Sequence, residues 1–143
     1  MNARFEWKWN EGDFKRMLSS AKEAQDKAAK LVAADVWANV RQESPVDEGR
    51  LAGSWNLSGS GLSYRISTSV EYAEMVHEGT APHVILPRTP GGVLVFQSNG
   101  RTVFAKRVNH PGTPANPYAE RAIDATRSRV DEFVNRAFRE AFA

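Results

Sequence analysis

Cysteine is absent from this chain of 143 residues, which excludes a disulfide framework and a thiolate metal site. No apolar run approaches the roughly 20 residues that a membrane-spanning helix needs. The first nine residues mix Arg4, Glu6 and Lys8 with aromatic side chains, so we expect neither a signal peptide nor a transmembrane helix. Packing must hold the fold, and 41% hydrophobic residues suffice for one domain spanning residues 1–143.

Acidic side chains are missing from Gly79 to Ala119, although the whole chain has a formal net charge of only +2. This small net charge argues against a protein that coats DNA. Two interpretations of the uneven charge stay open: separate solvated faces, or contact between identical subunits in which the basic part of one faces the acidic part of the next. The cations of the segment are Arg88, Arg101, Lys106 and Arg107, and the acids just before it are Glu71, Glu74 and Glu78.

Apolar residues recur every three or four positions from about Asn10 or Gly12 to Glu43, which predicts one long helix. The helix should end at Ser44, because Pro45 pushes the residue before it out of the α region. Its length of roughly 45–50 Å exceeds what a compact domain of this size needs. We therefore expect part of the helix to pack on a neighbouring molecule.

The middle of the chain predicts antiparallel strands. Alternation over Leu62–Val70 predicts the clearest strand, whereas Arg50–Leu57 is compatible with a helical turn or with a strand. Further strands are expected at Val84–Leu86, Val93–Gln97 and Arg101–Val108, the last two joined by an Asn-Gly hairpin.

Two more helices complete the predicted fold. A short one is expected over Tyr72–Glu78, ended by Gly79, and a long one from Asn116 or Pro117 to about Phe142. The sequence thus predicts an α+β fold: a long N-terminal helix, an antiparallel sheet of about four strands, and a C-terminal helix packed on the sheet.

Three strings of turn residues separate these elements: SPVDEGRLAGSW at 44–55, YAEMVHEGT at 72–80 and HPGTPANPYAERA at 110–122. Glycine accepts positive φ without steric cost, and proline fixes φ and removes a donor. We interpret these residues as structural joints that set the angles between elements. The joint residues are Pro45, Asp47, Gly49, Tyr72, Gly79, Thr80, His110, Pro111, Gly112 and Pro117.

The sequence contains only weak signals of a catalytic site. A metal-assisted hydrolase using His77, Glu78, His83 and His110 is the alternative from another functional class. However, there is no HExxH motif and no pair of histidines on one helical face, so hydrogen bonding that holds a loop is the favoured role. A G-x-S-x-G elbow and a phosphate-binding loop are also missing. We expect no enzyme activity and no cofactor.

The N-terminal segment, residues 1–9, is a candidate docking arm. Trp7 and Trp9 alternate with polar residues, and they need a surface either on their own domain or on an adjacent subunit, where tryptophan is a favoured anchor. Arg101, Lys106 and Arg107 are candidate contacts to another subunit or to DNA phosphates. Specific DNA recognition is not expected, because cations interleaved with few aromatics occur on many surfaces.

Taken together, the three strings resemble a known family. The first is close to SPVDTGxLRxS, with departures at Glu48 and Ala52, and the second is close to YAxxVHEGT followed by an HxIxP-like stretch at 83–87. The third is close to HPGTxAxPF, with Tyr118 as the aromatic residue. In this order and spacing, over residues 44–122, the chain resembles the minor tail or neck proteins of long-tailed bacteriophages, also described as tail-completion or head-tail joining proteins.

The resemblance implies a function in assembly. It implies a virion structural protein that forms a homo-oligomeric ring, expected to be a hexamer, at the head-tail junction. Its partners would be a head-completion or connector protein and a tail terminator or tail-tube protein. Double-stranded DNA would pass through the ring without specific recognition. The subunit would occupy the host cytoplasm during assembly and the virion afterwards, with no membrane contact.

Overall fold

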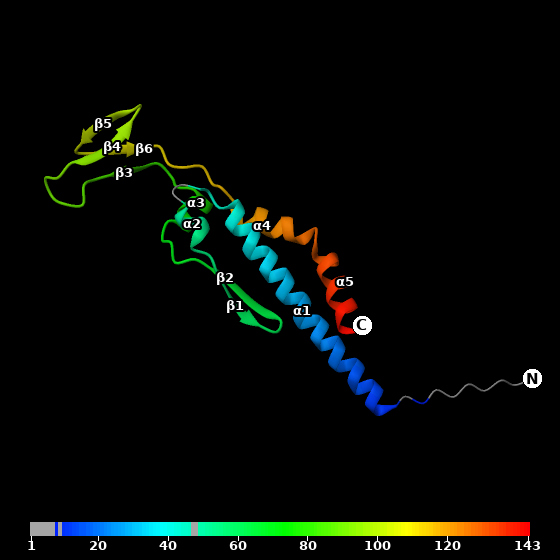
Figure 1. Ribbon diagram of the computed structural model, residues 1–143. Helices are drawn as coiled ribbons and strands as arrows, with labels where there is room; N and C mark the ends of the chain where they lie inside the picture. Colours follow the sequence, from blue (N-terminus) through cyan, green and yellow to red (C-terminus); the bar gives the residue numbers. More distant parts are fainter. Residues whose placement is uncertain (1–7, 9, 47–48) are drawn as a thin grey trace, which may run out of the picture. The chain divides into compact units, whose positions relative to one another are not determined.

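The computed structural model describes residue 8, residues 10–46 and residues 49–143 (Figure 1). The chain divides into two compact units, each described here by itself: a helical unit, Met1–Val70 with Tyr118–Ala143, and a strand unit, Glu71–Pro117. Helices and antiparallel strands together make an α+β protein, as the sequence predicts. Among the described residues no helix is both long and apolar enough to cross a membrane.

The helical unit is built along α1 (Glu11–Glu43), whose 33 residues span about 50 Å. Asn10 caps its start, since the Asn10 Oδ1 accepts a hydrogen bond from the Gly12 amide at 2.8 Å. The helix ends at Ser44, which is extended with ψ 135° before Pro45. The predicted boundaries of the long helix are therefore confirmed.

A short helix and a hairpin follow α1. Helix α2 (Arg50–Gly53) precedes strand β1 (Asn56–Ser60), so the ambiguous segment 50–57 contains first a helical turn and then a strand. Strand β1 pairs antiparallel with β2 (Ser63–Ser67). This pair contacts α1, and β2 confirms the strand predicted over Leu62–Val70.

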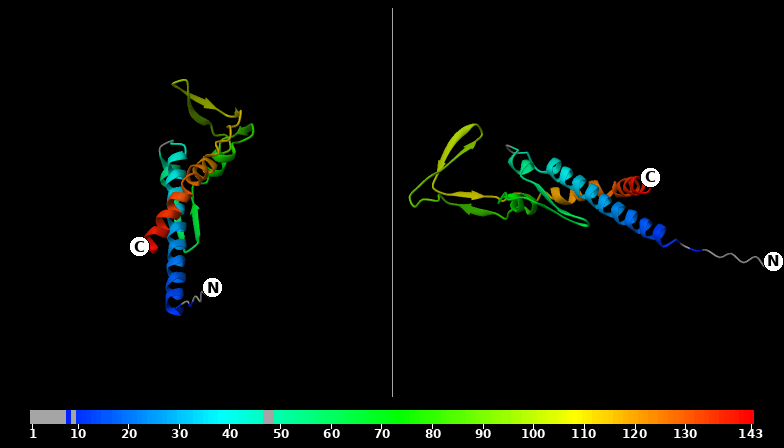
Figure 2. Two further views of the ribbon diagram at one scale, coloured as in Figure 1. Left: turned by 90° about the vertical axis from the view of Figure 1, so that its right-hand side faces the viewer. Right: turned by 60° about the horizontal axis from the view of Figure 1, so that its bottom comes forward.

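Two helices, α4 (Tyr118–Arg127) and α5 (Val130–Ala141), lie along α1 in every view (Figures 1 and 2). The prediction was one C-terminal helix packed on the sheet, and the structure differs in both respects. The two C-terminal helices pack on α1 because the small alanine side chains at the contact let the helix axes approach closely. The buried alanines of these three helices are Ala24, Ala28, Ala33, Ala122 and Ala137.

The break between α4 and α5 lies at Ser128 and Arg129. The Ser128 Oγ donates to the Ala125 carbonyl at 2.9 Å, and the Arg129 amide donates to the Thr126 carbonyl at 2.8 Å. Side-chain capture of a helix carbonyl competes with regular helical hydrogen bonds. Arg129 then pairs with Asp35 of α1 at 2.6 Å, which ties the start of α5 to the long helix.

The strand unit contains α3 (Ala73–Glu78) and four strands, β3 (His83–Ile85), β4 (Leu94–Ser98), β5 (Arg101–Ala105) and β6 (Val108–His110). Strand β4 pairs with β5, and β3 pairs with β6, both antiparallel. Among the described residues, six strands in three two-stranded sheets therefore replace the predicted sheet of about four strands. Glycines and prolines between the strands keep each pairing short.

The predicted hairpin at Asn99-Gly100 is confirmed. Asn99 and Gly100 have φ of 51° and 73°, the positive values that a two-residue turn between twisted strands requires. The short helix α3 also ends at Gly79 as predicted. The single strand predicted over Arg101–Val108 is wrong at its end, because β5 ends at Ala105 and a separate strand, β6, begins at Val108.

Candidate functional site

The second and third glycine-proline strings meet in the strand unit, at Thr80 and Thr113. The Thr80 amide donates to the Thr113 carbonyl at 2.9 Å, and the Thr113 amide donates to the Thr80 carbonyl at 3.0 Å. The Asn116 amide also donates to the carbonyls of Val76 and His77, 3.2 and 3.0 Å away. The end of α3 is therefore clamped to the chain that leads towards α4.

Two glycines allow this close approach. A Cβ on Gly79 would lie 2.5 Å from the Thr113 carbonyl oxygen, and a Cβ on Gly112 would lie 2.2 Å from the Thr80 carbonyl oxygen. Both glycines have positive φ, 75° and 89°. Any side chain would push the two backbone segments apart. The close approach depends on both glycines, and their role as a joint stays a prediction.

His83 and His110 are cross-strand partners in β3 and β6, and their rings stack with centroids 5.0 Å apart. Each Nδ1 is engaged by nearby backbone: His83 Nδ1 lies 2.9 Å from the Ala81 carbonyl, and His110 Nδ1 accepts from the Gly112 amide at 3.1 Å. His77 Nδ1 lies 2.9 Å from Glu78 Oε1. His83 and His110 thus contact the backbone of adjacent turns, whereas His77 contacts a neighbouring side chain within α3, and the loop-holding role of the histidines stays a prediction.

The alternative hydrolase site is not assembled by this geometry. Across residues 8, 10–46 and 49–143, no group of three or more histidine or carboxylate side chains comes together as potential metal ligands. His77 and Glu78 lie on α3, whereas His83 and His110 lie on the paired strands β3 and β6.

The first string forms a joint in the helical unit around Ser44 and Trp55. The buried Ser44 Oγ donates to the Val40 carbonyl at 2.6 Å and accepts from Trp55 Nε1 at 2.9 Å. The Trp55 ring meets Tyr118 edge to face at 6.1 Å. Trp37 Nε1 donates to the Trp55 carbonyl at 2.8 Å, so the tryptophan is held at both its ring and its backbone.

The other predicted joint residues occupy helix ends and turns. Pro45 is half-buried after α1, and Gly49, with φ 70°, begins α2. Tyr72 precedes α3 and Pro117 precedes α4. Pro111 is exposed next to β6. Asp47 and Glu48 lie outside the described residues, so the joint role predicted for Asp47 stays a prediction.

Tyr118, the first residue of α4, has an exposed fraction of 1%. Its burial, and secondarily the nearby Glu120 carboxylate, raise the pKa of the phenol above its usual value of 10.0. The neutral phenol is thus favoured in the fold.

The candidate contact residues of the strand unit are exposed. Arg88 lies between β3 and β4, Arg101 begins β5, and Lys106 and Arg107 lie between β5 and β6. Arg107 Nε donates to Asn109 Oδ1 at 3.3 Å. Glu71, Glu74 and Glu78 are exposed just before or within α3.

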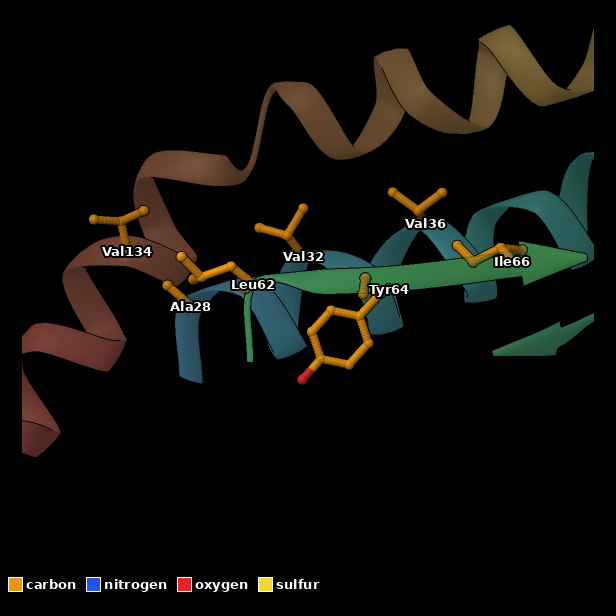
Figure 3. Close-up of a pocket in the computed structure, with 9 residues that line it drawn as sticks. Ala28, Val32, Val36, Leu62, Tyr64, Ile66 and Val134 are labelled. Carbon is orange, nitrogen blue, oxygen red and sulfur yellow. The ribbon is translucent and has the colours of Figure 1, made fainter. Parts of the chain in front are cut away.

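The helical unit also has an open apolar groove of about 450 Å³, which the sequence did not reveal. Figure 3 shows Val32 and Val36 of α1 beside Leu62 and Ile66 of the β1–β2 hairpin, with Val134 of α5 at one end. Leu62 remains 69% exposed. The described residues that line the groove are Ala28, Ala29, Val32, Ala33, Val36, Leu62, Tyr64, Ile66 and Val134.

The first third of α1 carries a second apolar surface. Its first buried residue is Ala24, so Glu11–Glu23 extends past the part of the helix that α5 covers (Figure 1). Phe14, Met17 and Leu18 are exposed by 44, 41 and 53%, and their spacing places them on one side of the helix. Trp7 and Trp9, the predicted docking residues, lie outside the described residues.

Comparison with protein-family models, curated proteins and solved structures gave no match. Function therefore has to be inferred from the residues and their geometry.

Proposed function

We propose that this chain is a virion structural subunit of the minor tail or neck type, which assembles into a six-fold ring at the head-tail junction of a long-tailed bacteriophage. In this role it completes the tail or neck, binds a connector protein on one side and a tail-tube or terminator protein on the other, and surrounds the passing DNA. The order and spacing of the three glycine-proline strings support the proposal.

The observation that carries the proposal is the exposed apolar surface of α1. Phe14, Met17 and Leu18 are exposed on the part of α1 that precedes its first buried residue, Ala24. Soluble monomers rarely expose large contiguous apolar patches, and patches of this kind mark interaction surfaces. A subunit that packs this stretch against neighbouring copies removes the apolar area from water.

The joints support the same function. A ring requires each subunit to present its surfaces at a fixed angle, and the backbone clamp between Thr80 and Thr113 limits that angle within the strand unit. The basic segment is better suited to protein contact than to DNA binding. A conduit that bound phosphates tightly along its wall would hinder the sliding of DNA.

The test is a phage that carries a stop codon in the reading frame of this chain. We expect capsids and tails that fail to join, seen by electron microscopy, and infectivity restored by supplying the chain in trans. A phage that produces normally tailed, infectious particles without the polypeptide would refute the proposal.

A further inference from the structure

The β4–β5 sheet exposes an apolar pair. Val95 and Phe104 are direct partners in the antiparallel register, so their side chains share one face, and they are 59 and 68% exposed. The next pair on that face, Gln97 and Thr102, is joined by a hydrogen bond of 2.8 Å. A two-stranded sheet is marginally stable by itself. An apolar cover over this face would therefore stabilise the hairpin.

Exposed cations flank this apolar pair at both ends of β5. Lys106 lies two residues after Phe104, just beyond the strand, and Arg101 lies at the hairpin end, where the alternation of side chains places it on the face opposite to Phe104. Within the described part of the chain, neither Arg101 nor Lys106 forms an ion pair. No acidic residue occurs from Gly79 to Ala119. This surface is therefore complementary to a partner surface that has an apolar centre and acidic residues around it.

The same chain carries such a surface on α3. Met75 is 59% exposed, and Glu74 and Glu78 lie on the same side of the helix within about 100° of it. Glu71 is exposed in the turn before the helix. Glu71 and Glu74 form no ion pair with any residue that the structure describes.

We propose that the β4–β5 face of one copy, centred on Phe104, binds the α3 face of the next copy, centred on Met75. The two faces are different, so the contact is heterologous, and in the proposed ring its rotation from copy to copy closes on itself. This inference rests on the proposed ring assembly and assigns a contact between its subunits in addition to the apolar surface of α1. Charge fixes the direction of the contact, because two β4–β5 faces repel each other, as do two α3 faces.

The test is a charge exchange between the two faces. One variant carries Arg101→Glu and Lys106→Glu, and the other carries Glu71→Lys and Glu74→Lys. Each variant alone places like charges at the contact, so we expect its self-association at low salt to weaken by about 100-fold. In an equimolar mixture every contact between unlike variants is attractive again. The mixture should assemble into rings with an even number of alternating subunits, measured by native mass spectrometry.

A matched control separates a specific contact from a general effect of charge. Arg127→Glu with Arg139→Glu makes the same change in net charge as the variant with Arg101→Glu and Lys106→Glu, on exposed positions of α4 and α5, and it should assemble like the wild type. Circular dichroism of each variant checks folding. Phe104→Ala, at a position that is already 68% exposed, should weaken assembly by about tenfold without unfolding the hairpin.

Several outcomes would overturn the interface. Variants that assemble like the wild type, or a mixture that stays dissociated, contradict it, and so does a wild-type chain that remains monomeric at low salt. Loss of duplex DNA binding with unchanged ring mass would assign the basic face to DNA instead. The experiment with the stop-codon phage tests the proposed function separately, because a ring that assembles through other surfaces would still join heads to tails.

Discussion

Thr80 and Thr113 exchange two backbone hydrogen bonds of 2.9 and 3.0 Å across 33 residues of sequence. The glycine beside each threonine makes this pairing sterically possible, since a Cβ on either would strike the opposite backbone. Two strings that look like separate turns in the sequence are thus the two halves of one clamp.

Gly79→Ala should open this clamp. The new Cβ would lie 2.5 Å from the Thr113 carbonyl oxygen, at a backbone conformation, φ 75° and ψ 179°, that is almost restricted to glycine. We expect a loss of about 1–3 kcal/mol in the local free energy of opening, measured by hydrogen exchange of the Thr80 and Thr113 amides. Gly91→Ala is the matched control, because Gly91 has φ 76° but open space around it. Equal protection in both variants would contradict the clamp.

Asp35 holds α1 to the junction of α4 and α5. Its carboxylate accepts from the buried Thr126 Oγ1 at 2.9 Å, from Asn39 at 3.0 Å and from Arg129 at 2.6 Å. Asp35→Ala removes one hydrogen-bond partner from Thr126 and one from Asn39. The free energy of unfolding, measured in urea, should therefore fall by about 2 kcal/mol. Asp124→Ala removes a carboxylate from the exposed pair with Arg127 and should change stability by less than about 0.5 kcal/mol. Similar losses in both variants would exclude a special role for Asp35.

Tyr118 should make the helical unit sensitive to high pH. Because burial raises the pKa of the phenol in the fold, the folded chain binds more protons than the unfolded chain once the pH exceeds 10.0. The contribution of Tyr118 to stability is complete below that pH and falls as pH rises through the folded pKa. Tyr118→Phe should therefore lose less stability than the wild type between neutral pH and strongly alkaline pH, measured by urea unfolding. Parallel pH profiles would show that the phenol stays protonated in both states or titrates equally in both.

Leu18→Asp tests the exposed surface of α1. Leu18 is 53% exposed, so the substitution should leave the fold of the monomer intact while it places a charge in the proposed apolar contact. We expect self-association to weaken by about tenfold or more in sedimentation experiments. Ser19→Asp adds the same charge at the next position, about 100° around the helix, and should assemble normally. Equal effects of the two substitutions would indicate a general charge effect.

Local signals in the sequence predicted the elements whose cause is local. Helix α1 begins at the Asn10 cap and ends before Pro45, and the β4–β5 hairpin turns at Asn99-Gly100. In each case one or two residues restrict the backbone directly, without help from distant parts of the chain.

Other features depend on residues that are far apart in the sequence. Nothing around Asp35 indicates that Thr126 and Arg129 will meet it, because 91 and 94 residues separate them. Strand β6 pairs with β3 through only three residues, too few for a period to emerge. The groove likewise combines α1, β2 and α5, none of which shows a cavity by itself.

The sequence by itself determined where the chain turns, where the long helix starts and stops, and where acidic residues are missing, because each of these properties is local. Tertiary structure decided that the last helices pack on α1 through alanines, that the strands form three separate pairs, and that the second and third strings close on each other. These outcomes depend on which surfaces exclude water most effectively once all elements are present, and that comparison can be made only in three dimensions.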